Sequence, residues 1–87
     1  MNNTVKDLIT NIIEQTIGKE ISNEEDLLGN DLGMDSLDLL DLVIGIEDEF
    51  FFEFDEEETH KIDGEMSIES LIDLVEKTLE RVRPRES

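Results

Sequence analysis

The residues best suited to chemistry lie in the stretch from Asp31 to Asp38, which reads Asp-Leu-Gly-Met-Asp-Ser-Leu-Asp. Within it, Ser36 follows a glycine-containing loop and opens an amphipathic segment, so its hydroxyl is expected to be exposed at the first turn of a helix. A phosphodiester there would face the positive end of the helix dipole and unpaired backbone N–H groups. From spacing alone the simpler interpretation is that Asp35 or Ser36 caps the helix, because both residue types are common N-caps.

The rest of the chain offers little that could catalyse a reaction or hold a metal. There is no cysteine, and the single histidine, His60, has no visible pattern that pairs it with a serine. A hydrolytic enzyme that uses Ser36 would therefore lack a base, and we expect His60 at the surface or at a helix end. The acidic runs 47–49 and 55–58 lack the alternating ligands and central glycine of an EF-hand. No metal site is expected beyond weak, non-specific binding of Ca²⁺ or Mg²⁺.

Three segments carry apolar residues at helical spacing, and no segment of the chain shows the alternation of a strand. Gly18 and Gly64 are placed to end helices, and Pro84 blocks continuation of the last one. The pair Asp55 and Glu58 has capping-box spacing. We predict a single domain over residues 1–87, an all-α four-helix bundle with three long helices and a short third one. The helices are expected at about 4–17, 36–50, 55–62 and 67–82, followed by a basic tail at 83–87.

Two features between these helices stand out. The connection 19–35 is long for a small domain, which is usual for functional loops, and Leu27, Leu28 and Leu32 are expected to hold it against the core. Four phenylalanines crowd the end of the second helix: Phe50, Phe51, Phe52 and Phe54. We interpret them as core residues of the bundle, with a recognition patch as the alternative.

The charge of the chain restricts its partners. The formal net charge is −18, and the region 20–60 contains 16 acidic residues and no Lys or Arg. Such a field repels nucleic acid and anionic membranes and attracts basic protein surfaces. No apolar run approaches the roughly 20 residues of a membrane span. We therefore expect a soluble, cytoplasmic protein.

The sequence Gly-Met-Asp-Ser-Leu at 33–37, followed by an acidic amphipathic helix, resembles the modification motif of acyl carrier proteins. The similarity extends over essentially the whole chain, through the helix lengths, the long first loop and the short helix before the last. It implies a monomeric carrier rather than a catalyst. In this family a phosphopantetheinyl transferase would attach 4'-phosphopantetheine to the Ser36 hydroxyl, and the thiol of that arm would hold acyl groups as thioesters.

The resemblance also implies surfaces for partners and for the acyl chain. Asp35 would lie beside the attachment site and assist the transferase. Acyl-loading, ketosynthase and other acyl-processing enzymes with basic docking surfaces would recognise the helix that follows, at Leu37, Asp38, Asp41, Glu47 and Asp48. The acyl chain would withdraw between the helices, lined by Leu40, Ile44, Ile46, Phe50, Ile62, Leu71 and Val75.

One departure from the family concerns the loop before the short helix. Where relatives often have a proline, this chain has Phe52-Glu53-Phe54-Asp55. The heavy phenylalanine cluster hints at a dedicated pathway, such as polyketide or another specialised acyl system, rather than general fatty-acid synthesis. An aminoacyl or peptidyl carrier would share the fold and the serine. An unmodified acidic protein-interaction module is the further alternative.

Overall fold

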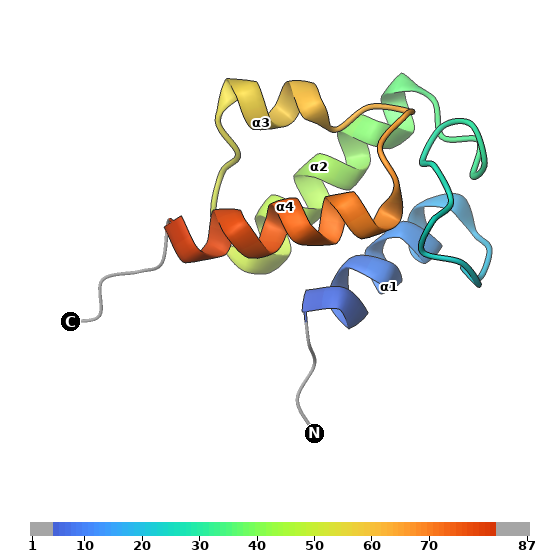
Figure 1. The fold of residues 1–87 in the computed structure, drawn as a ribbon, viewed down its shortest axis with the longest axis horizontal. Helices are drawn as coiled ribbons and strands as arrows, with labels where there is room; N and C mark the ends of the chain where they lie inside the picture. The colour runs from blue at the N-terminus through green and yellow to red at the C-terminus, as the bar shows by residue number, and fades with distance from the viewer. Residues whose placement is uncertain (1–4, 82–87) are drawn as a thin grey trace.

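The structure of the protein is a computed structural model that describes residues 5–81. Within that range it contains no strand; one isolated antiparallel bridge joins Leu27 and Ser67. The architecture is therefore the predicted all-α one, with three long helices and a short third helix (Figure 1). In chain order the helices are α1 (Val5–Ile17), α2 (Ser36–Phe50), α3 (Glu56–Lys61) and α4 (Ile68–Arg81).

The bounds of α2 are those predicted, whereas α3 and the start of α4 differ from the predicted bounds by a residue, because capping residues lie just outside these helices. Asp55 and Ile62 are the N-cap and C-cap of α3 rather than its first and last residues. Ser67 precedes α4, and its hydroxyl accepts a hydrogen bond from the Ser70 N–H at 3.1 Å. Gly18 ends α1 with a φ of +75°, as expected of a glycine at a helix C-terminus. The predicted start at residue 4, the end at 82 and the tail 83–87 lie outside the described residues.

The core forms where α1 packs against both α2 and α4. In Figure 1 these three long helices lie together, and α3 lies apart from α1 on the far side of α4. None of the helices within residues 5–81 combines the length and apolar character needed to cross a bilayer. The buried apolar residues are Ile9, Ile13, Leu28, Met34, Leu42, Val43, Ile46, Phe54, Ile62, Ile68, Leu71, Ile72 and Val75.

The long connection between α1 and α2 is fixed to the segment between α3 and α4. Leu28 is fully buried, as predicted, and its N–H bonds to the Met66 carbonyl at 2.9 Å. The Gly29 N–H bonds to the Gly64 carbonyl at 2.9 Å, and a Cβ on Gly29 would lie 2.6 Å from the Gly64 Cα. Glycine at both positions therefore allows the two loops to approach this closely.

The short helix α3 buries none of its own side chains. The residues that flank it are buried instead: Phe54 is 8% exposed and Ile62 is 6% exposed. Between them the Glu58 carboxylate accepts hydrogen bonds from the Thr78 hydroxyl, at 3.1 Å, and from the Arg81 guanidinium, both on α4. α3 is thus held at its two ends and by two hydrogen bonds between Glu58 and α4.

Three of the four phenylalanines form a cluster between the end of α2 and the start of α3 in the chain. The rings of Phe50 and Phe52 lie 6.2 Å apart, and that of Phe52 meets Phe54 edge to face at 4.9 Å. Phe51 is different, since it is 90% exposed and has a φ of +59°. The interpretation of Phe51 as a core residue was therefore wrong. It is the C-cap of α2, and its backbone turns its side chain away from the cluster into solvent.

Candidate functional site

Ser36 is the first residue of α2 and is exposed. Asp35, not Ser36, is the N-cap: its carboxylate accepts from the Asp38 N–H at 2.9 Å. The Asp38 carboxylate accepts in turn from the Asp35 N–H at 3.3 Å, which completes a capping box. Among the described residues no group hydrogen-bonds the Ser36 hydroxyl, so the fold leaves that hydroxyl available for other chemistry.

The residues just before Ser36 hold it at the surface. Met34 is 5% exposed, and its N–H bonds to the Leu28 carbonyl at 3.1 Å. Gly33 makes the preceding turn with a φ of +76°, a conformation that favours glycine. Because Met34 is anchored in the core, the chain emerges at Asp35 and presents Ser36 outward at the start of α2.

An apolar groove of about 290 Å³ begins at Ser36 and runs between α2 and the α3 region. Leu39, Leu40 and Val43 form the α2 side at spacings of three, four and seven residues from Ser36. This spacing places them on the same side of the helix as the serine, and it is the signal by which the sequence could have identified Leu39 and Val43. The opposite side of the groove is formed by Thr59, Ile62 and Asp63.

Two of the seven predicted acyl-pocket residues, Leu40 and Ile62, line this groove. Ile44 is 53% exposed and is not among the residues that line the groove, so its predicted place between the helices does not fit the structure. Phe50 is half-buried in the phenylalanine cluster. The three others are fully buried in the packed core: Ile46, Leu71 and Val75. The groove therefore runs over the core rather than into it.

The predicted recognition residues all lie on α2 or at its N-cap, but they are not equivalent. Leu37 is 70% exposed, and Asp41 and Asp48 are also exposed. Asp38 is half-buried and belongs to the capping box. Glu47 is half-buried as well, and its carboxylate accepts from the Phe54 N–H at 2.9 Å. Glu47 therefore has a structural role, because it holds the loop after α2.

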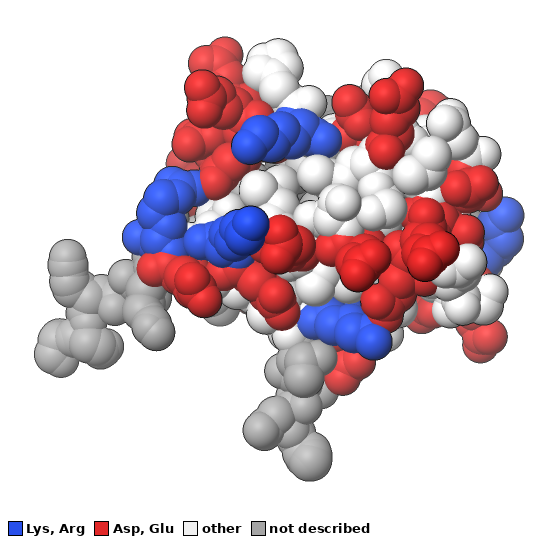
Figure 2. Space-filling model, viewed as in Figure 1, with Lys and Arg blue, Asp and Glu red and all other residues white. Residues whose placement is uncertain are grey.

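The charges of the described residues are unevenly distributed. α2 contains five acidic residues and no Lys or Arg. Figure 2 shows acidic side chains spread over the side of the molecule that faces the viewer, with basic groups over α3 and α4, at the start of α1 and at the edge of the molecule. The described basic residues are Lys6, Lys19, Lys61, Lys77 and Arg81, all outside α2.

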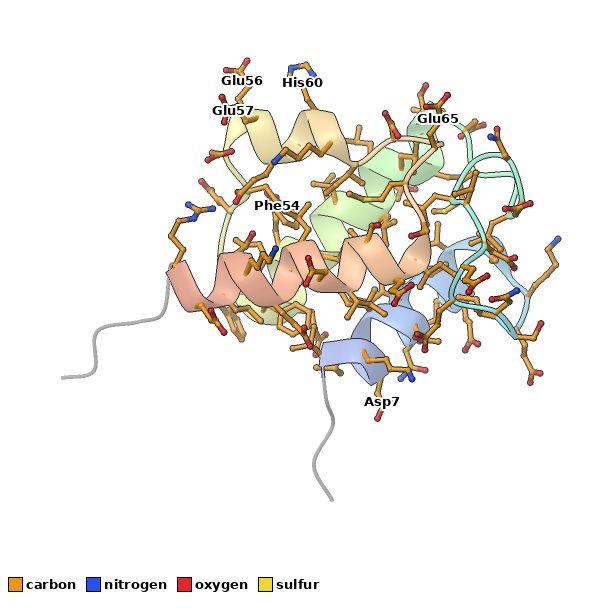
Figure 3. All side chains as sticks on the ribbon, in the orientation of Figure 1. Asp7, Phe54, Glu56, Glu57, His60 and Glu65 are labelled. Atoms are coloured by element: carbon orange, nitrogen blue, oxygen red, sulfur yellow. The ribbon has the colours of Figure 1, made fainter. Side chains whose placement is uncertain are left out.

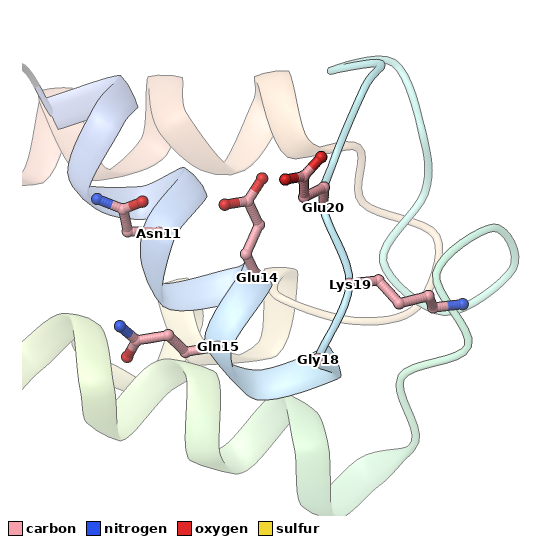
Figure 4. A pocket seen from close by; sticks show the side chains of 6 residues that line it. All are labelled: Asn11, Glu14, Gln15, Gly18, Lys19 and Glu20. Carbon is pink, nitrogen blue, oxygen red and sulfur yellow. The ribbon is translucent and has the colours of Figure 1, made fainter.

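A second hollow lies at the C-terminal end of α1, and Ser36 is not among the residues that line it (Figure 4). It has a volume of about 360 Å³ and polar walls, which include Asn11, Gln15 and Lys19. The Glu14 carboxylate on its wall accepts from the Ile21 N–H at 2.8 Å and so holds the loop after α1. Its polar lining makes this hollow a poor site for an acyl chain.

The expectation of a surface histidine is confirmed. His60 is exposed on α3 and points away from the body of the protein, as do Glu56 and Glu57 in Figure 3. Within residues 5–81 no three His, Cys, Asp or Glu side chains are grouped so as to hold a metal ion.

Comparisons with known proteins identify the family. Residues 7–76 match the family described as a phosphopantetheine attachment site. The chain is 39% identical over 80 residues to acyl carrier protein 3 of Ralstonia nicotianae, an alignment that covers 90% of this chain and 88% of that protein. It is 38% identical over 79 residues to the acyl carrier protein of Coprothermobacter proteolyticus, covering 91% and 85%. The chain belongs to the acyl carrier protein family.

An acyl carrier protein is a carrier of acyl groups, not an enzyme, and bears a covalently attached 4'-phosphopantetheine. It interacts with a phosphopantetheinyl transferase and with acyl-processing enzymes. The residues around Ser36 fit such an arm, since its hydroxyl is exposed and no group of the described residues hydrogen-bonds it. The apolar groove that begins at Ser36 offers a surface for the chain that the arm would bear.

Proposed function

We propose that Ser36 is the attachment residue and that this acyl carrier protein delivers acyl chains to enzymes of fatty-acid, polyketide or related acyl synthesis. The proposal rests on one observation at the start of α2. Asp35 caps the helix, and the Ser36 hydroxyl is exposed and makes no hydrogen bond with the described residues. When bound, the phosphopantetheine arm supplies a thiol that holds the acyl group as a thioester. Cysteine is absent from the chain, so that thiol would be the only one.

The groove beside Ser36 is proposed as the site that binds the first part of the acyl chain. Leu39, Val43 and Ile62 provide apolar contact, and Leu40, which is half exposed, also lines the groove. The Thr59 hydroxyl donates to the Asp55 carbonyl at 3.0 Å, so it does not add an unpaired polar group to the lining. Apolar burial of this kind contributes about 25 cal/mol per Å² of surface removed from water.

The acidic face of α2 is proposed as the side from which partner enzymes approach the arm. Asp41 and Asp48 are exposed, whereas Asp38 and Glu47 are partly engaged in holding the fold. Exposed carboxylates of one sign steer a basic partner and give complexes that weaken as salt rises. We further propose that residues 1–87 act as one monomeric carrier domain in the cytoplasm, without nucleic-acid or membrane partners.

The test of the attachment site is intact-protein mass spectrometry. The protein is measured before and after incubation with coenzyme A and a broad-specificity phosphopantetheinyl transferase. We expect the wild type to gain one phosphopantetheine and Ser36→Ala to gain none. Ser22→Ala is the matched control, since Ser22 is also exposed but lies in the loop before α2; this variant should be modified like the wild type. A folded wild-type protein that gains no mass would instead favour an unmodified interaction module.

A further inference from the structure

The groove beside Ser36 follows only part of the length of α2. The last residue of α2 that lines it is Val43, and from Ser36 to Val43 a helix advances about 10 Å. α2 itself continues beyond Val43 as far as Phe50. On the opposite side the groove is lined by Thr59, in the second half of α3, and by Ile62, the C-cap of that helix. The groove therefore lies between the first half of α2 and the C-terminal part of α3.

The next turn of α2 is occupied by Phe54. Glu47 lies one helical turn beyond Val43, and its carboxylate accepts a hydrogen bond from the Phe54 N–H at 2.9 Å. This bond holds residue 54 beside α2 immediately after the groove. The Phe54 side chain is 8% exposed, and Figure 3 shows it between α3 and α4. It belongs to the same buried apolar cluster as Val43 and Ile62 of the groove.

The ring of Phe54 is fixed by its neighbours. Phe52 meets it edge to face at 4.9 Å, and Phe50 lies against Phe52 at 6.2 Å. Aromatic pairs in such arrangements stabilise one another beyond the area that they bury. Ile46, which lies on α2 between the groove and the phenylalanine cluster, has no exposed surface. A chain that enters at Ser36 thus meets packed side chains at the far end of the groove.

We propose that Phe54 closes the far end of the groove and limits the acyl chain that this carrier shelters to about eight carbon atoms. The length follows from the distance of about 10 Å between Ser36 and Val43, because each carbon of an extended chain adds somewhat less than the C–C bond length of about 1.5 Å. The end of a longer chain would stay in water and gain nothing from burial. This inference rests on the proposed function for the identity of the chain as an acyl group, whereas the length of the groove is a property of the fold.

The probe for the length of the groove is a set of straight alkyl chains attached at its start. The chain has no cysteine, so Ser36→Cys introduces a single thiol at residue 36. Alkyl methanethiosulfonates with four, six, eight, ten or twelve carbons react with that thiolate, which forms a disulfide to the alkylthio group and expels methanesulfinate. Intact-protein mass spectrometry verifies one alkyl chain per molecule. No enzyme or phosphopantetheine takes part in this reaction.

Thermal unfolding of each product is followed by circular dichroism. We expect the melting temperature to rise by about 3 °C for each two carbons, as partial burial of two methylene groups would give. The rise should stop at about eight carbons, and the products with ten and twelve carbons should melt at the same temperature as the one with eight.

Shortening the side chain of residue 54 in the Ser36→Cys protein should lengthen the groove. An apolar space left by a missing ring stays dry and binds apolar molecules, so a longer chain can fill it. In Phe54→Ala the melting temperature should continue to rise to twelve carbons, and the longest chain should restore part of the stability that the variant loses. Phe54→Leu keeps a buried apolar side chain, remains folded, and should move the limit to about ten carbons. Phe51→Ala is the matched control, because Phe51 is 90% exposed, and its limit should stay at about eight.

Three results would overturn the proposal: a melting temperature that rises to twelve carbons with Phe54 present, no rise at any length, or the same limit in Phe54→Leu as in Phe51→Ala. The mass measurement with coenzyme A on the protein that retains Ser36 separates these results from the proposed function. A chain that gains no phosphopantetheine but shows the limit set by Phe54 would retain the closed groove and lose the carrier proposal. The reverse pair of results would retain the carrier and lose the limit.

Discussion

At the scale of single residues, the site depends on which neighbour performs the capping. Asp35 satisfies the Asp38 N–H, and the Ser36 hydroxyl is left without a structural task among the described residues. At two other positions, Phe51 and Gly29, the residue type and the backbone can be compared, and the two cases are opposite. Phe51 has a side chain where the backbone favours none, and Gly29 has none because there is no room for one.

Replacing Phe51 with glycine should stabilise the folded protein. The change relieves a left-handed conformation that costs about 1–2 kcal/mol, and the entropy of the unfolded glycine chain offsets about 0.5–1 kcal/mol of this. We expect a net gain of up to about 1 kcal/mol in the free energy of unfolding, measured in urea. Glu53→Gly is the control, since Glu53 does not have a positive φ, and it should lose stability. A lower stability for Phe51→Gly would show that the ring supports the fold.

Replacing Gly29 with alanine should destabilise the protein. The new Cβ would lie 2.6 Å from the Gly64 Cα, and neither atom can rotate aside, because the backbone of residue 29 fixes the Cβ and the Gly64 Cα is itself a backbone atom. We expect a loss of about 2 kcal/mol, within the usual range for overpacking, in the same urea titration. Asn30→Ala, at the adjacent exposed position, should change stability by much less. Equal effects of the two variants would mean that the two loops separate at little cost.

At the scale of the helices, α3 differs from the other three. It buries no side chain of its own, and the Glu58 carboxylate connects it to Thr78 and Arg81 on α4. Burial alone would raise the pKa of Glu58. Hydrogen bonds from the Asp55 N–H, Arg81 and Thr78 outweigh burial, and the pKa lies below its ordinary value. The charged form of Glu58 therefore stabilises the folded state.

Glu58→Gln should lower the stability of the protein at neutral pH by about 1 kcal/mol, because the donors that now meet a charged carboxylate would meet a neutral amide oxygen. Because the pKa of Glu58 is lowered in the folded protein, the carboxylate stabilises the fold fully at pH values above its ordinary pKa. This stabilisation is lost as the pH falls through the lowered pKa of the folded protein. The difference in the free energy of unfolding between wild type and variant should therefore be largest at pH 7 and shrink below about pH 4.5. Urea unfolding of both proteins at several pH values measures it. A difference independent of pH would assign the effect of the variant to packing.

At the scale of the whole molecule, charge dominates. The net charge is −18, and within residues 5–81 the ion pairs are Lys6–Glu24, Lys77–Asp73 and Arg81–Glu58. Most carboxylates therefore have no cation beside them and repel one another in the folded state. The same excess of acids suits a protein that meets basic partners in brief complexes.

Added salt or millimolar divalent cation should raise the melting temperature, because both reduce the repulsion among carboxylates. Thermal unfolding followed by circular dichroism at constant pH measures the effect, and an increase of several degrees between low salt and 0.5 M NaCl is about what a change of 1 kcal/mol would give. A melting temperature that does not change across the titration would contradict this prediction.

The sequence by itself determined the elements and the family. Periodic apolar residues and short capping patterns identify four helices to within about a residue, since these signals are local in the chain. The pattern Gly-Met-Asp-Ser-Leu at the start of the second helix points to the acyl carrier proteins, and the matching relatives confirm that family. The surface position of His60 also follows from local pattern, because it lies in a strongly acidic, polar segment.

Only the tertiary structure decided which side chains face the core, the groove or the solvent. Ile44 and Phe51 are as apolar as their buried neighbours, but the packing of α2 on α1 and the left-handed turn at residue 51 place both in solvent. Glu47 is acidic like Asp48, but it is folded inward to the Phe54 N–H. Such distinctions depend on how the helices pack and on the backbone turn after α2, and helical spacing alone does not predict them.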